Sequence, residues 1–120
     1  MSYDKNNIFA KILRGEIPCK KIYENNFILA FYDINPQKKI HALLIPKGEY
    51  INLDNFLEKA SDKEIIEFNK AILTVAKMLK VSNQDRGYRV LSNIGKDGGQ
   101  EVPHLHFHLF GGETVGKMVV

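Results

Sequence analysis

Helical spacing of apolar residues occurs in two separate stretches of the chain. Within residues 7–14 the apolar positions recur three and four apart and stop at Gly15, which predicts a short amphipathic helix. The second stretch opens with a capping box, in which the Ser61 hydroxyl and the Glu64 carboxylate each pair with an otherwise free backbone amide. One apolar stripe then continues to about residue 80, which predicts a long helix able to cover a sheet.

Strand patterns fill the segments between and after these helices. The first two strands are expected to form a hairpin around Asn25-Asn26, and Pro46 closes the third. Short connections between consecutive strands favour antiparallel pairing. We therefore expect an α+β fold with a five-stranded antiparallel sheet, one short helix and one long helix. The five predicted strands cover residues 22–24, 27–32, 40–45, 88–93 and 104–110.

Composition fits one globular domain over residues 1–120. A chain of 120 residues can bury a sizeable core without disulfides or a structural metal. Its 44% hydrophobic and 26% charged residues are ordinary for such a domain. The net charge of +3 comes from scattered lysine pairs, whereas nucleic-acid binding usually needs a concentrated basic face. We therefore expect no nucleic-acid partner.

The compartment is predicted from cysteine usage and from the N-terminal residues. Cys19 is the single cysteine, so no intrachain disulfide can form and a reducing compartment is the simplest setting. The first seven residues lack the apolar core of a signal peptide, and no apolar run approaches membrane-spanning length. We expect a cytoplasmic protein with no membrane partner.

Residues 104–110 carry the candidate chemistry, because three histidines alternate there with large apolar residues. In a strand, successive side chains point to opposite faces, so the three imidazoles share one face at a spacing of about 6–7 Å. The opposite face carries Leu105, Phe107 and Leu109, which are predicted to pack in the core. Imidazoles in this arrangement suit either one phosphoryl group or a zinc ion with an open fourth position. Both interpretations stay open on the pattern alone.

The pattern resembles the histidine triad superfamily, whose motif alternates histidine with apolar residues as residues 104–110 do here. Asn93 and the glycine-rich residues 98–100 match the same family. Further matches to its Hint branch are Ile8-Phe9, Ile17-Pro18, Leu29-Ala30-Phe31, Asp33-Ile34, His41 and Ile45-Pro46-Lys47, so the resemblance spans residues 7–112. It implies a HIT-like fold and a homodimer that joins two sheets into one of ten strands.

The same resemblance implies an activity. Hint proteins hydrolyse purine nucleoside phosphoramidates at the α-phosphate, without a cofactor, and bind purine nucleotides such as AMP or GMP. By position, His106 would be the nucleophile of a nucleotidyl-histidine intermediate, and His104 would orient it and fix its tautomer. His108 would donate a hydrogen bond to a non-bridging phosphoryl oxygen. His41, from another strand, would join this cluster.

Substrate-binding positions also follow from the resemblance. Asp33 would accept hydrogen bonds from the ribose hydroxyls. The phosphate and ribose would be contacted by Asn93, Gly99, Gln100 and Glu101. The base pocket would be lined by Ile8, Phe9, Ile12, Phe31, Ile34 and Leu43.

Three departures from the family limit what is carried over. Glu101 stands where serine or threonine is common, so its backbone is expected to matter more than its carboxylate. The tail 113–120 lacks the tryptophan-proline-rich ending of many Hint proteins and is expected to be mobile or in dimer contacts. Asn7 and Ala10 replace a zinc-binding cysteine pair, so no metal is predicted. The alternatives are a zinc-dependent hydrolase built on the three histidines and a non-catalytic nucleotide-binding or interaction module.

Overall fold

A five-stranded antiparallel sheet is the centre of the computed structural model, which describes residues 2–117. Its strand order is β1-β2-β3-β5-β4, so the last strand of the sequence lies between β3 and β4. This confirms the predicted α+β architecture and brings the histidine segment beside the third strand. The strands are β1 (Lys21–Glu24), β2 (Ile28–Tyr32), β3 (Ile40–Pro46), β4 (Arg89–Leu91) and β5 (Phe107–Gly111).

Residues 2–117 contain three helices, one more than the sequence predicts. The short α1 (Ile8–Leu13) and the long α3 (Asp62–Met78) lie where expected, and the capping box of Ser61 and Glu64 is formed. The additional α2 (Leu53–Lys59) begins at Asn52, whose side chain accepts a hydrogen bond from the Asn55 amide. Leu53, Phe56 and Leu57 have helical spacing, but α2 is only seven residues long and Phe56 is its one buried residue, so the pattern is too short to predict a helix.

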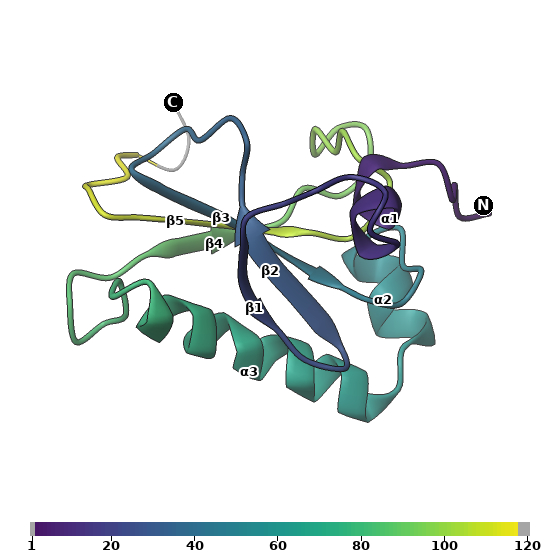
Figure 1. The fold of residues 1–120 in the computed structure, drawn as a ribbon, viewed down its shortest axis with the longest axis horizontal. Helices are drawn as coiled ribbons and strands as arrows, with labels where there is room; N and C mark the ends of the chain where they lie inside the picture. Colours follow the sequence, from purple (N-terminus) through teal and green to yellow (C-terminus); the bar gives the residue numbers. More distant parts are fainter. Residues whose placement is uncertain (1, 118–120) are drawn as a thin grey trace.

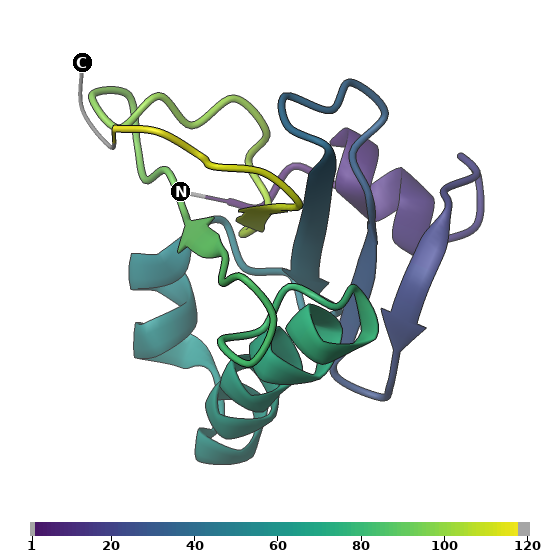
Figure 2. The same ribbon diagram turned by 90° about the vertical axis from the view of Figure 1, so that its left-hand side faces the viewer.

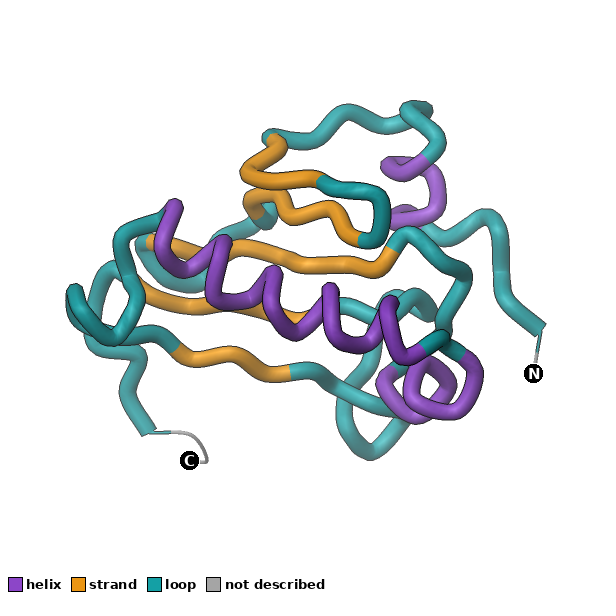
Figure 3. The backbone as a smooth tube through the Cα atoms, turned by 90° about the horizontal axis from the view of Figure 1, so that it is seen from below, coloured by secondary structure: helices purple, strands orange, loops and turns teal. Residues whose placement is uncertain are grey.

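The two faces of the sheet pack against different elements, and β2 shows why. Ile28 and Ala30 join the larger core, which includes Phe68 of α3, whereas Leu29 and Phe31 join a second core with Phe9 of α1. Because β2 is buried on both faces, its sequence is continuously apolar. Figures 1 and 3 show α3 running along one face of the sheet, and Figure 2 shows α1 on the other side.

The histidine segment is only partly a strand, which corrects the predicted range 104–110. Strand β5 begins at Phe107, and its pairing with β3 runs from Leu44 opposite Phe107 to Ile40 opposite Gly111. Before it, the Leu105 amide donates to the Tyr50 carbonyl in the loop after β3. Leu105 and Leu109 are nevertheless fully buried and Phe107 packs against the same core, as the alternation predicts.

The described part of the C-terminal tail lies beside the ends of β3 and β4. The Lys39 amide donates to the Glu113 carboxylate at 2.7 Å, and the Arg89 guanidinium donates to the Gly116 carbonyl at 2.6 Å. The expectation for the tail extends to residues 118–120, which lie outside the described residues. Within residues 2–117, no helix is long and apolar enough to span a membrane.

Phe68 is expected to be a principal stabilising residue, because its ring packs against Phe56 of α2 and Phe107 of β5 with centroids 5.5 and 5.2 Å away. Phe68→Ala should lower the free energy of unfolding by about 3–5 kcal/mol, measured by urea denaturation. Leu73→Ala is the matched control, since Leu73 lies on the same helix and is 48% exposed. Equal losses in the two variants would contradict this view of the core.

Candidate active site

His41 and His108 come from neighbouring strands and contact each other on the sheet face opposite α3. His41 lies on β3 and His108 on β5, and His41 Nε2 is 2.9 Å from His108 Nδ1. The Gln37 amide donates to His41 Nδ1 at 3.2 Å, so the proton of His41 is on Nε2. The Nε2–H of His41 donates to His108 Nδ1. Asp33 Oδ2 lies 3.3 Å from His41 Nε2. His108 consequently carries its own proton on Nε2 and is a hydrogen-bond donor there.

His106 has the complementary arrangement. Its Nδ1 is 2.8 Å from the carbonyl oxygen of His104, and because a carbonyl only accepts, Nδ1 carries the proton. Nε2 therefore holds a free lone pair, and within residues 2–117 no group hydrogen-bonds to it. The Phe9 ring packs edge-on against the imidazole with centroids 4.9 Å apart. An imidazole held in this tautomer is a competent nucleophile at Nε2.

His104 is fully buried, and both of its ring nitrogens are engaged. Nε2–H donates to the Pro46 carbonyl at 2.9 Å, and Nδ1 lies 2.6 Å from the Tyr3 hydroxyl. The three histidines therefore do not converge on one point. It is the backbone carbonyl of His104, not its ring, that bonds to His106. A zinc site made of His104, His106 and His108 does not fit this arrangement, because His104 has no free nitrogen to offer.

The histidines of the site are held in their neutral form. Burial lowers the pKa of His104 to about 4. Burial lowers the pKa of His108 to about 4, and the repulsion that a protonated His108 would meet from protonated His106 or His41 adds to this effect. Burial also lowers the pKa of His106, although the nearby Asp33 and Glu101 carboxylates act to raise it. Burial lowers the pKa of His41 in the same way, and the Asp33 carboxylate acts to raise it. A neutral His106 is what nucleophilic attack requires.

A cavity of about 1120 Å³ lies in front of these side chains and collects most of the predicted site. Gln100 and His104 are the two predicted residues that do not line it. The Gln100 side-chain amide instead donates to the backbone carbonyls of Ile51 and Val102, which holds the glycine-rich loop in place. The predicted residues that line the cavity are Ile8, Phe9, Ile12, Phe31, Asp33, Ile34, His41, Leu43, Asn93, Gly99, Glu101, His106 and His108.

Several lining residues had no predicted role. Residues 17–20, ahead of β1, form part of the wall and add the cation of Lys20, while Gln37 fixes the His41 tautomer through its backbone. A second cavity of about 490 Å³ reaches the other side of His108 and is lined by Lys38 and Arg89. Turn residues of this kind give no periodic signal in a sequence, so only the fold could identify them.

Asp33, His41 and His108 form the one group in the described part of the chain that could hold a metal ion, with potential ligand atoms within 4.8 Å of one another. The hydrogen bonds argue against a preformed site. His41 Nε2 carries the proton that it donates to His108, so a metal would have to displace that proton. The cluster is therefore better described as a hydrogen-bonded relay.

Comparisons with known proteins agree on one family. The family model for the HIT domain matches residues 14–115. The chain is 51% identical over 118 residues to an uncharacterised 13.2 kDa HIT-like protein from Azospirillum brasilense, covering 98% of this chain and 95% of the relative. Among solved structures it is similar to a histidine triad protein from Clostridium difficile, with 38% identity, a TM-score of 0.82 and coverage of 97% and 98%. A HIT family hydrolase from Clostridium thermocellum matches with 34% identity, a TM-score of 0.82 and coverage of 98% and 99%.

The depressed histidine pKa values predict how stability depends on pH. An unfolded histidine titrates near 6.5 and His104 in the fold near 4, so between these values the unfolded chain binds more protons. The free energy of unfolding should therefore fall as the pH drops from 6.5 to 4, with His104 contributing a slope of about 1.4 kcal/mol per pH unit.

Urea denaturation across this range measures that slope, and His104→Gln is the comparison variant because it removes the titrating ring. The variant should show a shallower dependence than the unmodified chain. Equal slopes would show that His104 is not held neutral by the fold.

Proposed function

The chain belongs to the HIT domain family, and on that premise we propose that it is a nucleotidyl hydrolase that cleaves the P–N bond of purine nucleoside 5′-phosphoramidates. One observation carries the proposal. His106 is held with Nδ1–H on a backbone carbonyl, so its unprotonated Nε2 is left as the nucleophile in a cavity of nucleotide size.

Two displacements at phosphorus account for the reaction. His106 Nε2 attacks the α-phosphorus, a P–N bond to the histidine forms, and the bond to the amine breaks as the amine takes up a proton from solvent. Water then attacks the nucleotidyl-histidine and gives up a proton to solvent, the P–N bond to His106 breaks, and the nucleoside monophosphate is released with His106 restored. A covalent intermediate of this kind divides one difficult displacement into two easier ones.

His108 supports both steps through the proton on its Nε2. The relay from the Gln37 amide through His41 makes His108 a donor on its cavity side. A donor there can hold the negative charge of a non-bridging phosphoryl oxygen in the transition state. His41 has a positioning role in this scheme, because it acts on phosphate through His108.

The remaining lining residues suit the rest of a nucleotide. Apolar side chains from α1, β2 and β3 offer a slot for the flat faces of a purine, and Asp33 can accept hydrogen bonds from ribose hydroxyls. Gly99 has a φ of +79°, a conformation that glycine adopts without strain, and it lets the loop backbone approach a phosphate. The second cavity, beyond His108, is positioned to take the leaving amine.

Edge strand β4 supports the proposal of a homodimer. It is the last strand in the order of the sheet, so one side of its backbone is free of a strand partner within the described chain. Pairing of two β4 strands would produce the ten-stranded sheet that the family resemblance implies. Analytical ultracentrifugation would give twice the monomer mass, and a monomer at assay concentration would refute the dimer.

His106→Ala should abolish the activity with the fold intact. Turnover of a fluorogenic adenosine phosphoramidate is expected to fall on the order of 10⁴-fold or more, because the covalent route is lost with its nucleophile. Mass spectrometry of the unmodified enzyme, denatured rapidly during turnover, should detect a nucleotide bound to His106. Full activity in the variant would contradict the mechanism.

Two controls separate the alternatives in the same assay. Binding of AMP to His106→Ala should persist, and a chain that binds AMP but never turns over the phosphoramidate would be a non-catalytic nucleotide-binding module. Exhaustive chelation should leave the activity unchanged. Loss of activity on chelation, with recovery on adding zinc, would favour the zinc-dependent hydrolase.

A further inference from the structure

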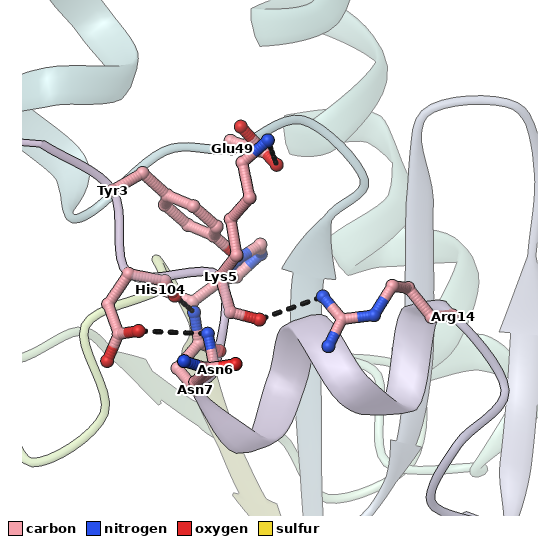
Figure 4. Close-up of polar contacts among 8 residues, drawn as sticks. Tyr3, Lys5, Asn6, Asn7, Arg14, Glu49 and His104 are labelled. Atoms are coloured by element: carbon pink, nitrogen blue, oxygen red, sulfur yellow. Dashed lines mark hydrogen bonds and ion pairs between the residues drawn. The ribbon is translucent and has the colours of Figure 1, made fainter.

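Tyr3 contacts the histidine motif from the opposite end of the chain. Its hydroxyl oxygen is 2.6 Å from His104 Nδ1, and the two rings meet edge to face with centroids 5.6 Å apart. Figure 4 shows Tyr3 beside His104, in the segment that precedes α1. Tyr3 does not line the cavity, so it has no direct contact with a bound nucleotide.

The direction of this hydrogen bond is fixed by the other side of the His104 ring. Nε2 lies 2.9 Å from the Pro46 carbonyl, which can only accept, so the ring proton is on Nε2. Nδ1 is then an acceptor, and the Tyr3 hydroxyl donates to it. Because His104 is fully buried, Tyr3 supplies the partner without which this nitrogen would lose its hydrogen bond.

His104 connects this contact to the nucleophile. Its ring is clamped between Tyr3 and Pro46, while its own carbonyl oxygen accepts the Nδ1–H of His106 at 2.8 Å. The clamp therefore sets the position of the carbonyl that selects the His106 tautomer and the direction of Nε2. The Phe9 ring touches both imidazoles edge-on, at centroid distances of 6.3 and 4.9 Å.

The segment that bears Tyr3 is fastened to α1 by polar contacts. The Asn7 side chain caps α1 at the Ala10 amide and also donates to the Asp4 carbonyl at 2.7 Å. The Arg14 guanidinium donates to the Lys5 carbonyl at 2.8 Å (Figure 4). These contacts hold Tyr3 to the same helix that presents Phe9 to the histidines, so the N-terminal segment and α1 act as one support.

We propose that Tyr3 is a positioning residue for the nucleophile, acting on His106 through the ring and carbonyl of His104. This inference rests on the proposed function, since it assigns Tyr3 to the support of the same reaction. Tyr3 is expected to affect the rate of the covalent step and not nucleotide binding, because it lies outside the cavity. A small misplacement of a reacting atom is enough to slow such a step substantially.

Tyr3→Phe removes the hydroxyl and keeps the ring. We expect kcat, and the rate of the first turnover, to fall on the order of tenfold, with KM and AMP affinity unchanged within about twofold. Tyr23→Phe is the matched control, because it also removes a hydrogen-bonded tyrosine hydroxyl outside the cavity, one that accepts from Asn25 at 3.3 Å. Equal kcat in the two variants, or a loss confined to KM, would overturn the proposal.

A double-mutant cycle separates positioning from general destabilisation. If Tyr3 acts through the His104 ring, Tyr3→Phe should cause no further loss of kcat in a His104→Gln background. Independent losses that multiply would overturn the proposed route. Both variants are assayed at a temperature where thermal melting shows them to be folded, so that the rates compare native proteins.

Nitrogen NMR of labelled histidine measures the tautomers of His104 and His106 directly, without turnover. In the unmodified chain His104 Nδ1 should be the unprotonated nitrogen, and in Tyr3→Phe the ring should show mixed tautomers together with a shifted His106 Nδ1–H signal. Unchanged signals would overturn the role of Tyr3. A chain that hydrolyses no phosphoramidate would refute the proposed function alone, and these signals would then decide the role of Tyr3.

Discussion

The protonation pattern of four imidazoles, three of them buried and that of His108 half-buried, is the constraint on which the candidate site depends. Each ring has a partner that permits only one tautomer: the carbonyls of His104 and Pro46 can only accept, and the Gln37 amide can only donate. As a result, His106 presents an unprotonated Nε2 to the cavity and His108 presents an Nε2–H. Side chains of a single type thereby acquire opposite functions from the backbone around them.

The fold supplies these partners because its central strands are buried on both faces. Alternate residues of β2 and β3 pack against α3 and against α1, which keeps the sheet fixed between two apolar layers. On the α1 side, that layer ends in the histidines, and the low polarity there lowers their pKa values and keeps them neutral. Burial of the core and the neutral state of the proposed nucleophile, His106, are therefore effects of the same packing.

Periodicity predicted the sheet, α1 and α3 because those elements have apolar faces that a sequence displays. It missed α2, which buries only Phe56, and it extended the histidine strand back to His104, although pairing with β3 begins at Phe107. The family resemblance assigned the nucleophile to His106 and its orientation to His104. In the structure the atom of His104 that bonds to His106 is the carbonyl oxygen, a backbone atom that no sequence pattern marks. The contact of Tyr3 with His104 joins residues 101 positions apart, so only the folded chain could reveal it.

Direct attack of His106 on phosphorus is the central claim, and the stereochemical course of the reaction tests it most directly. A nucleoside phosphoramidate made chiral at the α-phosphorus with sulfur and hydrolysed in isotopically labelled water reports how many displacements occur there. Two in-line displacements, by His106 and then by water, predict overall retention of configuration. Inversion would mean that water attacks the substrate in one step, and it would contradict the covalent role assigned to His106.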